Sequence, residues 1–177
     1  TGRARDRRRH EVTLALAAAM LQAAGIAAST QHGERRAAEA LEGGRAAAVF
    51  GRMAAALGGP AGFVENPRKF LPHAPVELAV RAPKNGFVAG IATREVGLAV
   101  VSLGGGRRRP DDRIDHAVGI TRLSPVGAEV RAGEALALVH ARSQADAEVA
   151  AAAVLSAYTI GASKPPPEKA ALRRVLP

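Results

Sequence analysis

The clearest alternation of apolar and polar positions lies between Val76 and Ala141. Apolar residues alternate along Val76–Val80 and lead into Asn85-Gly86, a dipeptide that suits a tight hairpin turn because both residues tolerate positive φ. A second strand-turn-strand pattern runs from Val126–Val130 into the turn residues Ala132–Glu134. The pattern therefore predicts two β-hairpin units that pack together as a compact half-barrel.

Helical patterns flank these strands. Thr93–Arg109 is helix-like up to its glycines, and Ser143–Ala157 is an alanine-rich helix. Tyr158–Ile160 is expected to add a last edge strand. Strands and helices that follow one another in this irregular order predict the α+β class.

The N-terminal part contains helical patterns and no strand pattern. Glu11–Ala24 has an apolar stripe, with Asp6 as its expected cap and Gly25 as its expected end. Two further helices are expected over Ser29–Glu42 and Arg45–Leu57. Because the first helix carries alanine opposite its larger side chains, we expect it to be buried between other elements.

A proline-rich stretch separates the two parts. Residues 61–75 contain three prolines and two phenylalanines that we expect to hold the stretch in place. The predicted organisation is a helical segment over 1–60, a linker over 61–75, a domain over 76–161 and a tail over 162–177.

Composition narrows the functional classes. The chain has 177 residues, 47% of them hydrophobic, and no cysteine, so a disulfide framework and a thiolate metal site are excluded. The sequence contains no signal peptide and no apolar run of membrane-spanning length, so we expect a cytoplasmic protein without membrane partners. The polar start at Thr1 suggests a cut through a longer protein. The net charge of +9 invites nucleic-acid binding, but aromatic residues are only 3% and offer no stacking platform, so no nucleic-acid partner is expected.

Familiar catalytic patterns are missing from the sequence. There is no phosphate-binding loop, nucleophile elbow or zinc-protease helix motif. The histidines lie far apart without ligand spacing, so no metal site is predicted: His10, His32, His73, His116 and His140. His140 is interpreted as a structural histidine at a strand end. The carboxylates Asp111, Asp112 and Asp115 are interpreted as members of solvated ion pairs with the neighbouring arginines, namely Arg107, Arg108, Arg109 and Arg113.

One segment has functional promise, the glycine-arginine stretch from Gly104 to Arg113. Three successive glycines allow the backbone to approach a ligand closely, and the arginines that follow could meet a phosphate. The alternative is a flexible surface loop after a helix, which is a common use of a glycine run. Both interpretations stay open at this stage.

Several motifs, in order and with matching spacing, resemble the C-terminal part of the thymidine phosphorylases, within the pyrimidine-nucleoside phosphorylase family. The matching segments cover nearly the whole chain: Thr1-Gly2, Glu11–Leu16, Val49–Met53, Gly59-Pro60, Phe63–Asn66, Leu71-Pro72, Gly104–Arg108, Asp115 and Val118-Gly119. The resemblance implies a pentosyltransferase that converts thymidine and phosphate to thymine and 2-deoxyribose 1-phosphate. A cationic, hydrogen-bonding site suits this reaction because the departing pyrimidine develops negative charge.

The same resemblance implies where the chain fits. Residues 1–60 would be a helical remnant of the α/β catalytic domain, and 76–161 would be a C-terminal domain of the α/β-hammerhead, barrel-sandwich-like type. The family's phosphate-binding and pyrimidine-binding motifs cannot be matched onto this sequence, so no catalytic residue is assigned. The chain alone is therefore expected to be inactive. The resemblance implies no cofactor, because phosphate is a co-substrate. The implied homodimer forms through a region missing here. The possible substrate-binding residues are those of a lid over the cleft: Gly104, Gly105, Gly106, Arg107 and Arg108.

An alternative is a carrier or binding module. Val80–Val88 and Val126–Ala141 are similar to the two halves of a biotinyl or lipoyl carrier domain. Such carriers present a modified lysine at a hairpin tip, whereas here no lysine lies between Lys84 and Lys164, and Lys84 is in the wrong turn. A self-sufficient module should have a polar surface, whereas a severed domain should expose apolar side chains such as Leu14, Leu16 and Val49.

Overall fold

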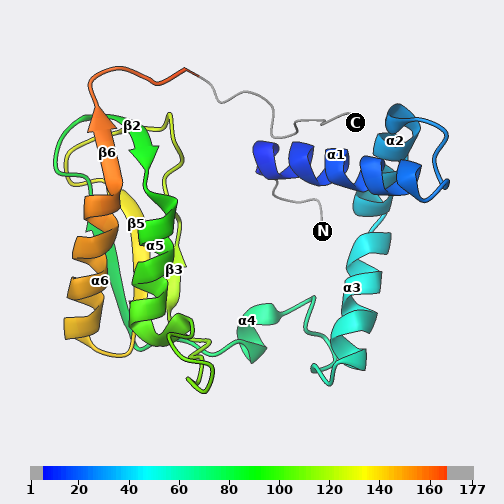
Figure 1. Cartoon of the computed structure of the whole chain (residues 1–177). Helices are drawn as coiled ribbons and strands as arrows, with labels where there is room; N and C mark the ends of the chain where they lie inside the picture. Colours follow the sequence, from blue (N-terminus) through cyan, green and yellow to red (C-terminus); the bar gives the residue numbers. More distant parts are fainter. Residues whose placement is uncertain (1–5, 167–177) are drawn as a thin grey trace. The chain divides into compact units, whose positions relative to one another are not determined.

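The computed structural model describes residues 6–166, and Figure 1 shows the course of the chain. The described chain divides into two compact units, one ending at Phe70 and the other beginning at Leu71. The first unit is helical, and the second contains all the strands together with two longer helices. Within residues 6–166 no helix is both long and apolar enough to cross a membrane.

Three longer helices and one single-turn helix build the first unit, and local sequence signals set the ends of the longer ones. Helix α1 spans Arg7–Ala23, and the Asp6 carboxylate accepts a hydrogen bond from the Arg9 N–H, as expected of a helix cap. Helix α2 spans Thr30–Glu42 behind a Ser29 cap, and α3 spans Arg45–Ala56. These bounds confirm the three helices predicted from the sequence to within a few residues.

The expected burial of the first helix is wrong. Ala18 is its only buried residue, at the point where Gly33 of α2 packs so closely that a Cβ there would lie 2.8 Å from the Ala18 Cα. By contrast, Leu16 is 47% exposed and Met20 is 72% exposed. A small-residue contact between α1 and α2 therefore fixes the pair without covering the larger apolar side chains of α1.

The end of the first unit is held by aromatic contacts. Helix α4, Pro67–Phe70, is a single turn within the predicted linker. The ring of Phe63 lies with its centroid 6.3 Å from that of Phe50 on α3 and 6.5 Å from that of Phe70. These tilted ring pairs support the expectation that the linker phenylalanines hold this stretch in place.

Two small antiparallel sheets form the second unit. One has the order β1-β5-β3 and the other β4-β2-β6, so neighbours in space are distant in sequence. The strand bounds are β1 Val76–Arg81, β2 Gly86–Ile91, β3 Gly119–Thr121, β4 Glu129–Val130, β5 Ala135–Ala141 and β6 Tyr158–Gly161. The edge position of β6 confirms the predicted last strand.

Neither predicted hairpin forms. Strands β1 and β2 flank Asn85 but lie in different sheets, and β4 and β5 are separated in the same way. Instead of closing a tight turn, the Asn85 side chain accepts a hydrogen bond from the Ala132 N–H at 2.8 Å, across 47 positions of sequence. Gly86 is required by a close strand approach, since a Cβ there would lie 2.4 Å from the Gly161 carbonyl oxygen.

Two helices complete the second unit and its core. Helix α5 spans Thr93–Val100 and continues into one π-helical turn, η1, over Val101–Gly105. Helix α6 spans Gln144–Ala157, packs against α5 and contacts β1 and β5 (Figure 1). The core draws on both sheets and on α6, and its largest fully buried side chains are Leu136, Val88, Val139 and Val154.

The buried hydroxyl of Tyr158 joins this core to a neighbouring loop. It donates to the Leu136 carbonyl at 3.3 Å and lies 3.2 Å from the Ser124 carbonyl, a second acceptor. The unit is therefore mixed helix and antiparallel sheet, which confirms the predicted α+β class. Of the predicted tail, residues 167–177 lie outside the described part of the chain.

Candidate functional site

The glycine-arginine loop, the stretch from Gly104 to Arg113, begins at the end of η1. Gly104 has φ 92° and ends the helical backbone, a conformation that glycine adopts without strain. A Cβ on Gly105 would lie 2.8 Å from Val100 Cγ1, and a Cβ on Gly106 would lie 2.8 Å from Val101 Cγ2. Gly105 and Gly106 thus pack closely against the preceding helical turns.

Inside the loop, Asp112 binds the backbone. Its Oδ2 accepts hydrogen bonds from the N–H groups of Arg108 and Arg109, both at 2.9 Å. The Asp112 N–H in turn donates to the Arg109 carbonyl at 3.1 Å. The interpretation of Asp112 as an ion-pair partner of the neighbouring arginine side chains is therefore wrong, because a short carboxylate reaches nearby backbone donors first.

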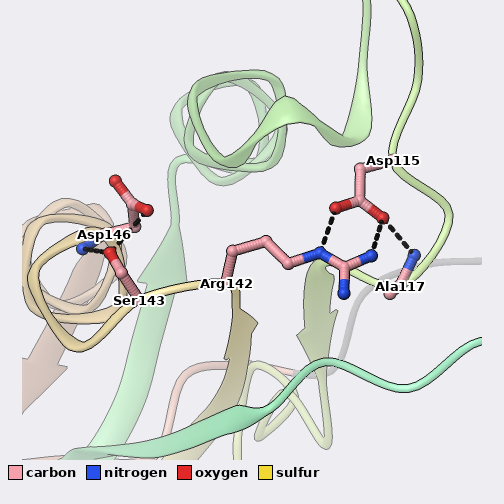
Figure 2. Close-up of polar contacts among 5 residues, drawn as sticks. All are labelled: Asp115, Ala117, Arg142, Ser143 and Asp146. Atoms are coloured by element: carbon pink, nitrogen blue, oxygen red, sulfur yellow. Dashed lines mark hydrogen bonds and ion pairs between the residues drawn. The ribbon is translucent and has the colours of Figure 1, made fainter.

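Asp115 pairs with Arg142, which lies between β5 and α6 (Figure 2). Its Oδ2 accepts from Arg142 Nε at 2.5 Å, and its Oδ1 accepts from Arg142 Nη2 at 2.8 Å and from the Ala117 N–H at 2.9 Å. The ion pair predicted with neighbouring arginines is wrong, since the partner comes from 27 positions away. Sequence reasoning missed Arg142 because no local pattern marks a partner at that separation.

The ion pair lowers the pKa of Asp115. The hydrogen bonds from Arg142, and then from the Ala117 N–H, lower the pKa of Asp115 from 3.8 to about 2. The side chain of Asp115 is 28% exposed and that of Arg142 is 53% exposed. A fork-shaped guanidinium bound to both carboxylate oxygens has a fixed geometry, so the pair defines an orientation as well as a charge contact.

A helix cap fixes the chain next to Arg142. Ser143 Oγ accepts a hydrogen bond from the Asp146 N–H at 3.1 Å and donates to Asp146 Oδ2 at 2.6 Å, which starts α6 (Figure 2). The Arg142 backbone is therefore held between the end of β5 and this cap. The side chain reaches the loop from between these two elements.

The histidines do not converge. His140 lies on β5 with Nε2 2.8 Å from Thr121 Oγ1 and Nδ1 3.3 Å from Glu77 Oε1, in contacts between neighbouring strands. This geometry agrees with the structural interpretation of His140. Among residues 6–166 no group of three or more histidine and carboxylate side chains could hold a metal ion.

Two pockets lie away from the glycine-arginine loop. One, of about 360 Å³, is lined by α5, η1 and α6, with Leu98, Ser102 and Val149 among its residues. The other, of about 430 Å³, lies between α3 and the stretch from Pro60 to Glu65. Neither is lined by any residue from Gly104 to Arg108.

The described side chains can bind an anion more readily than they can perform acid-base chemistry. In the loop, Arg107, Arg108, Arg109 and Arg113 are exposed. Two carboxylates near them are already occupied, Asp112 by backbone N–H groups and Asp115 by Arg142, whereas Asp111 in the same loop is exposed. The loop therefore combines an ordered backbone with cationic side chains.

Comparison with known proteins defines the class of the second unit first. Residues 87–161 match the pyrimidine nucleoside phosphorylase C-terminal domain, a range that begins in β2 and ends with β6. The chain therefore carries a domain of that class. Its resemblance to the thymidine phosphorylases is confirmed by curated relatives that carry that name.

The relatives cover most or all of the chain. Thymidine phosphorylase of Mesorhizobium japonicum is 68% identical over 177 residues, which is 100% of this chain and 40% of the relative. Those of Rhizobium meliloti and Burkholderia cenocepacia are 50% and 45% identical over 88% and 91% of this chain, and over 35% and 37% of their own lengths. The chain thus spans about 40% of the length of the first of these relatives and corresponds to a C-terminal part of a thymidine phosphorylase.

Proposed function

We propose that this chain is the C-terminal part of an enzyme that performs reversible phosphorolysis, converting thymidine and phosphate to thymine and 2-deoxyribose 1-phosphate. The observation that carries the proposal is the 68% identity, over all 177 residues, to a protein named thymidine phosphorylase. The carrier alternative is not favoured, because Lys84 follows β1 in a bend and no other lysine lies between Lys84 and Lys164.

The chain contributes one wall or lid of the active-site cleft, and the catalytic residues lie in the part of the enzyme that it does not include. The helices of the first unit belong to the catalytic α/β domain, and the second unit is of the α/β-hammerhead type. Positioning of both substrates supplies much of the rate enhancement in such a reaction, so the chain alone is inactive.

The remaining partners follow from this assignment. The substrates are thymidine and inorganic phosphate, with no further cofactor, and the complete enzyme is a cytoplasmic homodimer that associates through a region outside this chain. Nucleic acid and membranes are not partners. The net positive charge of the chain favours the approach of the anionic substrate, phosphate.

The lid is formed by the glycine-arginine loop. Gly104 turns the backbone at positive φ, and Gly105 and Gly106 hold it close to the preceding helical turns, as their close Cβ approaches require. Arg107 and Arg108 follow directly and are exposed. Guanidinium groups in this position favour a negatively charged ligand on the open side of the loop.

A phosphorolysis assay tests the proposal. Thymine release from thymidine and phosphate is followed for this chain and for the product of the uninterrupted reading frame that contains it. We expect release only from the longer product. Release from a clean preparation of this chain would overturn the inactivity of the part, and no release from either would overturn the proposed reaction.

A further inference from the structure

The glycine-arginine loop is held at both of its ends. At the first end, the packed glycines fix the backbone against Val100 and Val101. At the second end, the Asp115 N–H donates to the Gly104 carbonyl at 2.9 Å, which brings the two ends of the loop together. A loop closed in this way has its base defined by a few contacts around Asp115.

Asp115 connects that base to the body of the domain. Its carboxylate holds both Arg142 and the Ala117 N–H, while Arg142 is fixed by the adjoining strand and helix cap (Figure 2). Asp115 therefore has three connections: to the start of the loop, to the chain after the loop, and to the β5–α6 junction. Loss of the carboxylate would leave the loop attached through its backbone alone.

The guanidinium groups of Arg107 and Arg108 remain available to bind an anionic ligand. Within residues 6–166, no acidic side chain pairs with the guanidinium of Arg107 or Arg108, although Asp112 and Asp115 lie close in sequence. Both carboxylates are engaged elsewhere, and the one that takes an arginine takes Arg142. Pairing Asp115 with a distant arginine keeps it from neutralising the loop's own cations.

We propose that Asp115 and Arg142 are positioning residues, which set the orientation of the glycine-arginine loop and thereby the affinity of the cleft for its substrates. This proposal rests on the proposed function, because the loop acts as a lid only in a phosphorylase. Neither residue touches a reacting atom. Their effect is exerted through the backbone at Gly104 and Ala117.

A variant series separates the pair's contributions. Asp115→Asn removes the charge while its side-chain oxygen can still accept from the Ala117 N–H, and Asp115→Ala removes both. Arg142→Lys keeps the charge but loses the fork geometry, and Arg142→Gln loses both. Asp111→Asn is the matched control, because it removes the same charge from an exposed residue for which no polar contact is found within residues 6–166.

The first readout is structural and needs no enzyme activity. Limited trypsin digestion of this chain under native conditions measures cleavage after Arg107, Arg108 and Arg113. We expect Asp115→Asn and Arg142→Gln to raise the cleavage rate roughly tenfold, since a lost charge-assisted hydrogen bond shifts a local opening equilibrium by about that factor. Asp111→Asn should digest at the unmodified rate, and equal rates for all variants would overturn the proposal.

The second readout separates positioning from simple stabilisation. In the product of the uninterrupted reading frame, we expect Asp115→Asn and Arg142→Gln to raise KM for thymidine and phosphate roughly tenfold while kcat stays within about a factor of two, because a misplaced lid weakens binding in ground and transition states alike. Arg142→Lys should recover part of this loss. Faster digestion with unchanged KM values would reduce the pair to a structural contact and overturn the positioning role.

The two readouts distinguish this proposal from the proposed function. If the unmodified longer product releases no thymine, the assigned reaction fails, and with it the role in substrate affinity. The digestion result would then still decide whether the pair orients the loop. Thermal unfolding of each variant shows whether the digested and assayed proteins are folded. If Asp115→Ala does not fold, the conservative variant Arg142→Lys still provides the test.

Discussion

At the scale of single residues, Asp115 shows how one side chain can serve the backbone and a distant partner at once. It binds Arg142 through both oxygens and caps the Ala117 N–H. Asp112 uses its carboxylate on two backbone donors only. Two carboxylates three positions apart thus have different roles, which their sequence context does not separate.

The lowered pKa of Asp115 predicts a pH dependence of stability. The pKa is about 2 in the folded chain against an ordinary 3.8, so its stabilising contribution is complete above about pH 4 and is lost as the pH falls toward 2. We expect the free energy of unfolding of Asp115→Asn to lie below that of the unmodified chain at pH 6 to 7, in the range where carboxylates are ordinarily ionised. The difference should close between about pH 4 and pH 2, and a gap that persists unchanged at about pH 2 would contradict the assignment.

Tyr158 allows a second test, because it is the single tyrosine and the chain has no tryptophan. Burial raises the pKa of its phenol above 10.0. The phenol hydroxyl also donates a hydrogen bond to the Ser124 carbonyl. The raised folded pKa means that this group's stabilisation is present below its unfolded pKa and is lost as pH rises through the folded one. Tyrosinate absorbance should therefore titrate at a higher pH in the native chain than in denaturant, and coincident titrations would contradict burial of the hydroxyl.

At the scale of elements, the β4-β2-β6 sheet depends on a close strand approach that only glycine permits. Gly86 of β2 faces the Gly161 carbonyl of β6 and the Ile160 side chain, at 2.4 Å and 2.9 Å from a Cβ placed there. Backbone cannot move away from such a contact as a flexible side chain could. The register between β2 and β6 therefore relies on the absence of a side chain at this position.

We expect Gly86→Ala to destabilise the chain by about 1–3 kcal/mol, because the added methyl overpacks the β2–β6 contact. Gly90→Ala is the control in the same strand, where a Cβ meets nothing within 4 Å. Urea unfolding of both variants checks the prediction. Equal midpoints for the two variants would show that the strand approach does not constrain position 86.

At the scale of the whole molecule, several large apolar side chains remain exposed on the helices of the first unit. Leu16 is 47% exposed and Val49 is 52% exposed, as predicted for a severed domain, whereas Leu14 is half-buried. Leu57, at 81%, is more exposed than either. Apolar side chains left uncovered in this number are typical of a surface that packs against further protein.

This exposure predicts that the isolated chain associates with itself. Met20→Gln with Leu57→Gln should lower the associated fraction, with a change in stability within about 0.5 kcal/mol, because both side chains are largely exposed. Sedimentation over a range of concentrations provides the measurement. Val149→Gln is the control from the second unit, and an equal response to it would show that the first unit is not the associating surface.

The lid arginines give a prediction for the complete enzyme. Replacing both Arg107 and Arg108 with alanine should lower kcat/KM for thymidine phosphorolysis by roughly tenfold or more, because two cations are removed from the closing loop. Arg131→Ala is the control, as it removes one exposed arginine from the turn between β4 and β5. Unchanged kcat and KM in the double variant would show that the loop is not part of the cleft.

The sequence by itself determined the longer helices and the resemblance to the thymidine phosphorylases. Helix ends were predictable because caps such as Asp6 and Ser143 act on donors three residues away. The position of the glycine-arginine loop after a helix was predictable for the same local reason.

Only the tertiary structure decided how the strands pair and which side chains meet. The Asn85-Gly86 dipeptide carries a hairpin signal, yet β1 pairs with β5 and β2 with β4 and β6, because burial of the shared core outweighs the turn preference. The Asp115–Arg142 pair likewise depends on the fold bringing the β5–α6 junction next to the loop. Local patterns determine elements, whereas contacts between distant residues require the packed chain.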